Sequence, residues 1–480
     1  MSSDAAGQAA QPEGRRTPER HPLPAPARRR AQPSARTLLL LYADPRMRRQ
    51  LFAGLRPWLD ERGLRLVLAD DELGEPDRAL FHELLPMPPP RFLAQAVDRL
   101  CDHALRQPFD AILAESELAL LPGALASARL GLPHLGLRAA HLVTNKWLCR
   151  RELAAAGVPV PRFALAGSAA DVRRFGDEHG YPLLLKATAS SMARLVLLVR
   201  DARDVQAAAA RMLDRLPAAP DVARLLRFAA LAELDPGCDP LREFLVEEYV
   251  EGEQLEVDGL VRGGVPQAFG VTALRLSPPP RFFVEGYLLP AERPAPELLE
   301  LERVGLQAVQ ALGLQEAGFC VELRRAAQRT VVIEVNGRLG QDEGLAEMFE
   351  RALGHAPLRL WLEAMGCGWR GPLPRPLRAA ALAFACHYAD ATVQAVPESR
   401  RVPAGADGTS LEVQVVVQPG DRVHGPPHVD AFPHLACALA GHPHSSGAAY
   451  AAARAAADGL RFQLAPLVSA PQERADEGAG

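Results

Sequence analysis

The sequence predicts a mixed protein in which an α/β unit is followed by α+β units. The chain has 480 residues, more than one hydrophobic core usually serves, so we expect two to four packed units. In its first part, short apolar runs alternate with amphipathic stretches, as in strands and helices around a parallel sheet. From Phe163 to about Arg370, strand patterns outnumber helical ones.

Composition excludes several classes of protein. A net charge of -4 gives no general attraction for nucleic acid or anionic membranes, and no apolar run is long enough to span a bilayer. The seven cysteines contain no CxxC pair, which argues against a disulfide framework or a zinc site and favours a reducing compartment. We therefore expect a cytoplasmic protein with neither nucleic-acid nor membrane partners.

The first 35 residues are predicted to be a disordered tail. They are rich in Pro, Ala, Arg and Gln and carry almost no large apolar side chains, so they cannot bury enough surface to become ordered. The arginines leave two alternatives open, a transit peptide and a segment that binds an anionic partner.

Residues 36–140 are predicted to form an N-terminal α/β domain. The apolar run Leu38–Tyr42 is typical of a strand buried on both faces of a parallel sheet. The predicted elements are the strand Leu38–Tyr42, a helix near Met47–Glu61, the strand Leu64–Ala69, a helix near Phe92–Leu105 and the strand Ala111–Ala114.

Residues 141–372 are predicted to form a larger β-rich domain, in which Gly157–Pro161 breaks a helix and marks a joint. Its predicted helices are Ala202–Leu216 and Pro296–Leu312. Its predicted strands are Pro182–Lys186, Leu195–Val199, Phe244–Val250, Leu255–Val261, Phe282–Leu289, Phe319–Leu323 and Val331–Asn336.

A proline-rich segment, Gly371–Pro376, is predicted to separate a last α+β unit at 373–480. There the strand pattern Leu411–Val417 precedes a Pro-Gly-Asp turn. An alanine-rich helix is predicted over Ser446–Gly459.

Two acidic residues in neighbouring strand patterns carry the strongest chemical signal. Glu322 and Glu334 face each other if the chain forms a hairpin centred on Gln328. Opposed like charges are destabilising unless a cation lies between them. Alternation places Asn336 and Arg338 on the face of Glu334. Two carboxylates and an amide oxygen suit Mg²⁺, and the arginine suits a phosphoryl group or an oxyanion. A salt-bridged surface hairpin is the alternative interpretation.

This pattern resembles the magnesium-binding strands of the ATP-grasp superfamily, which read Glu, eleven residues, then Glu-x-Asn-x-Arg. The resemblance implies an ATP-grasp fold with an N-terminal Rossmann-like parallel-sheet domain, a two-lobed nucleotide-binding region whose lid covers about 163–250, and a C-terminal α+β portion. It implies ATP and Mg²⁺ as cofactors, with two ions expected and Mn²⁺ as a substitute.

Other segments follow in the order of that family. Asn145–Arg150 and Pro182–Lys186 resemble the segments whose lysines, here Lys146 and Lys186, neutralise ATP phosphates. Phe244–Gly252 resembles the linker that holds adenine. By this resemblance the carbonyl of Glu247 and the N–H of Val250 would pair with the base.

Two departures from the family pattern affect the nucleotide site. The loop after Lys186 contains no glycine, so the hydroxyls of Ser190 and Ser191 or the charge of Arg194 would replace backbone closure over the phosphates. The ribose-binding glutamate of the family falls on Gln254, an amide that accepts hydrogen bonds less strongly. Glu253 and Glu256 are alternatives for that role.

Within the superfamily, Ser277–Ala291 resembles carboxylate–amine ligases, such as L-amino-acid ligases, carnosine-synthase-like enzymes and natural-product amide ligases. By this resemblance Arg281 would meet a substrate carboxylate and Glu285 an amine. A proline-rich exposed turn is the alternative.

The resemblance implies an ATP-dependent ligase that joins a small carboxylate to an amine through an acyl phosphate and releases ADP and phosphate. Its partners would be ATP and the two small substrates, with the oligomeric state left open between a monomer and a homodimer. Two alternatives are an ATP-binding protein without turnover and a carboxylase that resembles biotin carboxylase.

Overall fold

The computed structural model describes residues 36–467 except 192–193, 279–282, 328, 404 and 426–432. The described residues belong to one compact unit, which begins at Pro33. The predicted tail lies outside them. None of the helices described is both long and apolar enough to cross a membrane.

The N-terminal region contains the predicted parallel sheet. Its strands are β1 (Arg36–Leu41), β2 (Leu64–Asp70), β3 (Glu83–Pro86) and β4 (Ala111–Leu113), in the order β3-β2-β1-β4. Every pairing is parallel, so the carboxyl ends of all four strands lie at one edge of the sheet. The four leucines from Leu38 to Leu41 are fully buried, as their unbroken apolar run predicts.

Two details of this region differ from the prediction. The helix expected over Met47–Glu61 is two helices, α1 (Pro45–Phe52) and α2 (Leu55–Glu61), because Gly54 has a φ of 68° and interrupts the helical path. The strand β3 was not predicted. Four residues that include a proline give little period-2 signal.

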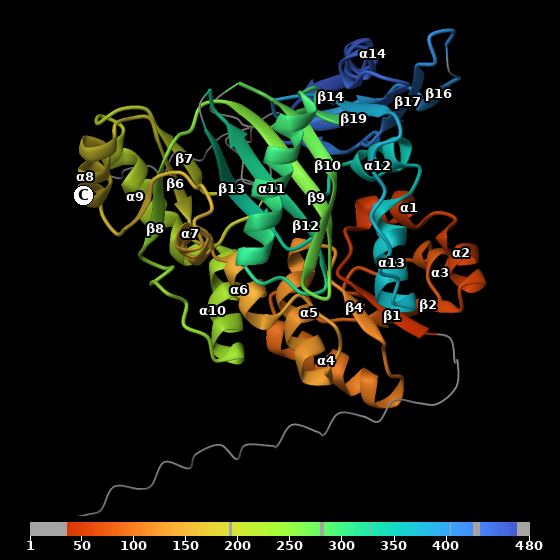
Figure 1. The fold of residues 1–480 in the computed structure, drawn as a ribbon, viewed down its shortest axis with the longest axis horizontal. Coiled ribbons are helices and arrows are strands. Elements are labelled where there is room, and N and C mark those ends of the chain that lie inside the picture. Colours follow the sequence, from red (N-terminus) through yellow and green to blue (C-terminus); the bar gives the residue numbers. More distant parts are fainter. Residues whose placement is uncertain are drawn as a thin grey trace, which may run out of the picture. The chain divides into compact units, whose positions relative to one another are not determined.

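A nine-stranded antiparallel sheet dominates the remainder (Figure 1). Its order is β13-β12-β9-β10-β11-β14-β19-β17-β16, so strands after residue 373 continue the sheet that begins before it. The strands are β9 (Glu253–Arg262), β10 (Val265–Leu276), β11 (Val284–Leu289), β12 (Ala317–Arg325), β13 (Thr330–Asn336), β14 (Ala379–Cys386), β16 (Arg400–Val402), β17 (Ser410–Val415) and β19 (His434–His442).

The hairpin β12–β13 has the predicted register at its two glutamates, because Glu322 pairs with Glu334. A bulge follows, because Leu323 pairs with Val332 and Ile333 is the extra residue. The displaced carbonyl of Ile333 accepts a hydrogen bond from Arg150. Gln328, the expected centre of the turn, lies outside the described residues.

A separate four-stranded antiparallel sheet has the order β5-β8-β6-β7. Its strands are β5 (Phe163–Ala166), β6 (Leu183–Ala187), β7 (Val196–Val199) and β8 (Phe244–Glu248). Helices α8 (Ala169–His179) and α9 (Val205–Arg215) share its hydrophobic core. This sheet carries Lys186 and Glu247 on the neighbouring strands β6 and β8.

The other helices cover the sheets or connect them. In Figure 1, α11 (Ala295–Ala311) lies across the nine-stranded sheet, and α13 (Pro357–Cys367) lies beside β1. The remaining elements are α3 (Asp77–Leu80), α4 (Leu93–Arg106), α5 (Glu117–Leu130), α6 (Leu137–Thr144), α7 (Lys146–Ala155), α10 (Pro220–Ala232), α12 (Leu345–Leu353), α14 (Ser446–Asp458) and the small sheet of β15 (Ala391–Ala395), β18 (Arg422–Val423) and β20 (Gln463–Pro466).

Candidate active site

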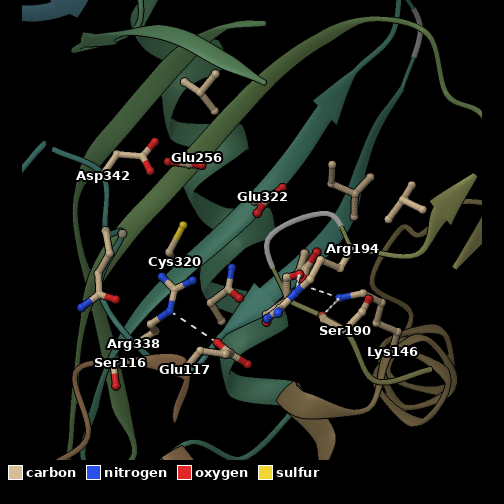
Figure 2. Close-up of a pocket in the computed structure, with 18 of the residues that line it drawn as sticks. Ser116, Glu117, Lys146, Ser190, Arg194, Glu256, Cys320, Glu322, Arg338 and Asp342 are labelled. Atoms are coloured by element: carbon tan, nitrogen blue, oxygen red, sulfur yellow. Dashed lines mark hydrogen bonds and ion pairs between the residues drawn. The ribbon is translucent and has the colours of Figure 1, made fainter. Parts of the chain in front are cut away.

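One cavity of about 720 Å³ is bounded by the four-stranded sheet, the nine-stranded sheet and the carboxyl edge of the parallel sheet. The close-up in Figure 2 labels some of the side chains that line it. The site residues expected from the sequence that line this cavity are Lys146, Lys186, Ser190, Ser191, Glu247, Val250, Gln254, Glu322, Glu334, Asn336 and Arg338.

Three carboxylates on adjacent strands line one wall of the cavity: Glu334, Glu322 and Glu256, which we call the acidic row. Glu334 pairs with Glu322, and Glu322 pairs with Glu256 on β9. Directly opposed residues share a face, and neighbouring strands lie about 5 Å apart. Burial and the charge of Glu334 raise the pKa of Glu322 to about 7. The protein therefore holds like charges together at an energetic cost, and a cation between them would remove that cost.

The donor set suits Mg²⁺. Asn336 lies two residues after Glu334 on β13 and also lines the cavity. Glu322, Glu334 and Asn336 thus offer hard oxygen ligands from two adjacent strands, with the cavity open beside them for phosphate and water ligands.

Lys146 neutralises one member of the acidic row. Its ammonium group lies 2.6 Å from a carboxylate oxygen of Glu334 and donates to the carbonyl of Ser190 at 3.0 Å. Asn145 caps α7 by accepting from the N–H of Leu148, which fixes the first residue of the helix beside the cavity. Burial alone would raise the pKa of Glu334, but Lys146 and then Lys186 lower it below its ordinary value.

Lys186 is held by a buried ion-pair network. It contacts Glu247, which also accepts from Arg150 at 3.2 Å. The Glu247 side chain is 1% exposed. Burial would raise the pKa of this carboxylate, but Lys186 and Arg150 hold it below its ordinary value. The side chain of Glu247 thus positions the lysine, a role separate from that expected of its backbone carbonyl.

The loop after Lys186 is tied to α10 rather than presented freely to the cavity. The N–H and hydroxyl of Ser191 donate to Asp221, at 3.1 and 3.2 Å, and Arg194 donates to the same hydroxyl at 2.8 Å. The hydroxyl of Ser190 is buried and has no hydrogen-bond partner in the described part of the chain. Ser190 is therefore the better placed of the two serines to bind an incoming oxygen.

Comparisons with known proteins agree with this geometry. Residues 179–345 match the family model for an ATP-grasp domain. This range includes Lys186 on β6 and the hairpin β12–β13. The chain contains an ATP-grasp domain. An L-amino acid ligase from Bacillus licheniformis shares the fold, with a TM-score of 0.70 at 19% identity over 90% of this chain and 99% of that one.

The sequence is also similar to a named ligase and to an uncharacterized protein. The D-alanine–D-alanine ligase of Methylibium petroleiphilum is 25% identical over 274 residues, which cover 54% of this chain and 74% of that enzyme. An uncharacterized protein of Sinorhizobium fredii, y4rH, is 33% identical over 195 residues. That alignment covers 41% of this chain and only 36% of y4rH.

In the ATP-grasp domain, Gln254 connects the acidic row to a basic residue. Its amide donates to Glu322 at 2.9 Å and accepts from Arg324 at 3.0 Å. Of the two alternatives for ribose binding, Glu253 is paired with Arg275 and Arg293. Glu256 lines the cavity and has no hydrogen-bond or ion-pair partner among the described side chains.

Arg338 follows the acidic hairpin and lines the cavity, as alternation on β13 predicts. Its guanidinium group lies 3.4 Å from Glu117 and donates to the carbonyl of Leu339 at 2.9 Å. In Figure 2 it lies beside Glu117, on the opposite side of the view from Lys146.

The two expected substrate contacts stay predictions. Arg281 lies outside the described residues. Glu285 lies near the start of β11 and accepts a hydrogen bond from the hydroxyl of Tyr388 at 2.6 Å. It is not one of the residues that line the cavity.

Sequence reasoning missed several residues in and behind the cavity. Arg150 does not line the cavity but is buried against Glu247, and a charged residue in the middle of a helix gives no sequence signal of that burial. Asp342 and Glu343 line the cavity from the loop before α12. Ser116 and Glu117 lie just after β4, and the rule that ligands bind beyond the carboxyl ends of parallel strands was the signal that could have found them.

Proposed function

We propose that this protein is an ATP-dependent carboxylate–amine ligase that forms an amide bond through an acyl phosphate. The observation that carries the proposal is the acidic pair Glu322–Glu334 with Asn336 in one cavity with two lysines and an arginine. Because ATP-grasp enzymes bind ATP with Mg²⁺, these three oxygen ligands are the proposed metal site. Two ions bound there would neutralise the triphosphate, and Mn²⁺ would substitute for them.

In the first step an oxygen of the substrate carboxylate attacks the γ-phosphorus of ATP, and the bond between the β–γ bridging oxygen and that phosphorus breaks. Lys186 and Lys146 would hold the phosphates, and Glu322, Glu334 and Asn336 would hold the Mg²⁺ ions that neutralise them. ADP and an acyl phosphate result.

In the second step the neutral amine attacks the acyl carbon, phosphate departs with the substrate oxygen, and one proton is released to solvent. Arg338 lies on the face of the acidic hairpin where the developing oxyanion would form, so its guanidinium group would stabilise that charge.

Isotope transfer tests this sequence of bonds. Substrate acid labelled with ¹⁸O in the carboxylate, found first by screening acid and amine pairs for ADP release, should yield one ¹⁸O atom in each released phosphate. Unlabelled phosphate during amide formation would refute the acyl phosphate.

Two controls separate the alternatives. ADP release that needs bicarbonate and no organic acid would favour a carboxylase. ATP binding without ADP release from any pair would favour a protein without turnover, an alternative supported by the glycine-free loop and by the tie between Ser191 and Asp221.

A further inference from the structure

The cavity has a second acidic region beyond the proposed magnesium ligands. We call Glu256, Asp342 and Glu343 the acidic end. Glu256 is 6% exposed, lines the cavity and has neither a hydrogen bond nor an ion pair among the described residues. Since burying an unpaired carboxylate is costly, this side chain points to a ligand of opposite charge.

The acidic end is built from separate elements that converge. Glu256 comes from β9, and the other two residues come from the loop before α12. The hydroxyl of Tyr287 donates to one oxygen of Asp342 at 2.6 Å and so orients that carboxylate. In Figure 2 Glu256 and Asp342 lie side by side, on the opposite side of the view from Lys146, Ser190 and Arg194.

Charge along the cavity is unbalanced. Twelve acidic and five basic side chains are among the described residues that line it. Of the basic ones, Lys146 and Lys186 pair with carboxylates at the nucleotide end, and Arg324 donates to Gln254 there. Other carboxylates of the cavity have basic partners, as Asp70 has Arg48, Glu248 has Arg162 and Glu343 has His434. ATP with two Mg²⁺ ions is close to neutral, so the nucleotide complex would leave Glu256 without a counter-charge.

We propose that the acidic end binds an ammonium or guanidinium group of the substrate, so that the enzyme ligates substrates with a positive charge remote from the reacting atoms. This inference rests on the proposed ligase function. Glu256 lies one strand spacing from Glu322 and two from Glu334, about 5 and 10 Å. A small diamine or a basic amino acid spans that distance.

A metal ion is the competing occupant, because Glu256, Asp258 and Cys320 come within 4.8 Å of one another. Their chemistry fits an organic cation better. Asp258 accepts the N–H of Gly340 at 3.2 Å and is not one of the cavity-lining residues. Cys320 is a soft sulfur ligand beside hard oxygens, a mixed set that suits neither Mg²⁺ nor Ca²⁺.

Matched substrate pairs test the proposal. ADP release from the full-length protein with Mg²⁺-ATP is measured for L-arginine against L-citrulline, L-lysine against L-norleucine, and putrescine against butylamine, each with a panel of acids and amines. We expect the cationic member of at least one pair to have a kcat/KM more than about tenfold higher, the gain from one charge-assisted contact.

Variants locate the contact. Asp342→Asn keeps an oxygen for Tyr287 and should abolish the preference for the cation while the KM for ATP stays unchanged; Asp342→Glu should restore part of it. Glu343→Gln provides a second variant if Asp342→Asn does not fold. The control variant Asp98→Asn, which removes a carboxylate paired with Arg129 at the surface, should retain the full preference.

The outcomes separate this inference from the ligase proposal. ADP release that favours the neutral members would overturn the inference and leave the ligase intact. If no pair releases ADP, thermal stabilisation of the protein by putrescine or L-arginine is measured instead. Stabilisation that is lost in Asp342→Asn would support cation binding at the acidic end without supporting the ligase function. The absence of such stabilisation, or tight binding of Mn²⁺ that needs Glu256 and Cys320, would overturn it.

Discussion

Replacing Glu322 by glutamine should stabilise the protein while damaging its function. The carboxylate is held between Glu334 and Glu256, and its pKa rises from 4.5 to about 7 because of burial and then the charge of Glu334. The folded state therefore binds this proton more tightly than the unfolded state. Stability is lost as pH rises from about 4.5 to about 7.

The magnitude follows from the size of that rise. A change of one pKa unit corresponds to about 1.4 kcal/mol, so full ionisation costs the folded protein up to about 3 kcal/mol. Glu322→Gln removes the cost and should raise the unfolding free energy by that amount at pH 8, and by much less at pH 5. Nucleotide binding in the presence of Mg²⁺ should weaken in the same variant.

Urea denaturation at pH 5 and pH 8, together with calorimetric titration of an ATP analogue, measures both effects. Glu300→Gln, on the exposed face of α11 beside Arg303, serves as the control and should show no gain at pH 8. Equal stability of Glu322→Gln and the unmodified protein at both pH values would refute the electrostatic argument.

Three further predictions concern basic and acidic residues near Glu322 and Glu334. Lys146→Met removes the ammonium group 2.6 Å from Glu334 and should weaken binding of an ATP analogue about tenfold or more in calorimetry; unchanged affinity would contradict a phosphate role. Arg338→Lys should lower kcat for ADP release about a hundredfold with little change in the KM for ATP; a loss confined to KM would contradict a transition-state role. Glu247→Gln leaves Lys186 and Arg150 buried without their counter-charge and should cost about 3 kcal/mol in urea denaturation, against about 1 kcal/mol or less for Glu75→Gln, whose carboxylate pairs with Arg78 at the surface.

The sequence predicted best where one interaction dominates. The unbroken apolar run Leu38–Leu41 predicts burial on both faces, and it forms an internal strand of the parallel sheet. The alternation of Glu334, Asn336 and Arg338 with apolar residues fixed which side chains share a face. The pairing of Glu322 with Glu334 then followed from hairpin symmetry.

Prediction failed where tertiary packing overrides local preference. The strands β14 and β19 contain many alanines, a residue depleted in strands, yet they are buried between β11 and β17 in the nine-stranded sheet. The strand β10 begins with a proline at its second position and has a register shift near Gly270, both of which weaken a strand pattern. The loop that carries Asp342 lies between β13 and α12 and lines the cavity through tertiary packing, which no local pattern encodes.

The most direct test of the magnesium site uses Mn²⁺ as a paramagnetic probe. Electron paramagnetic resonance counts the Mn²⁺ ions bound with a non-hydrolysable ATP analogue to the unmodified protein and to Glu334→Gln. We predict two nucleotide-dependent ions in the first and the loss of at least one in the variant, with the fold retained. Equal Mn²⁺ binding in both would contradict the assignment of Glu334 as a metal ligand and with it the proposed chemistry.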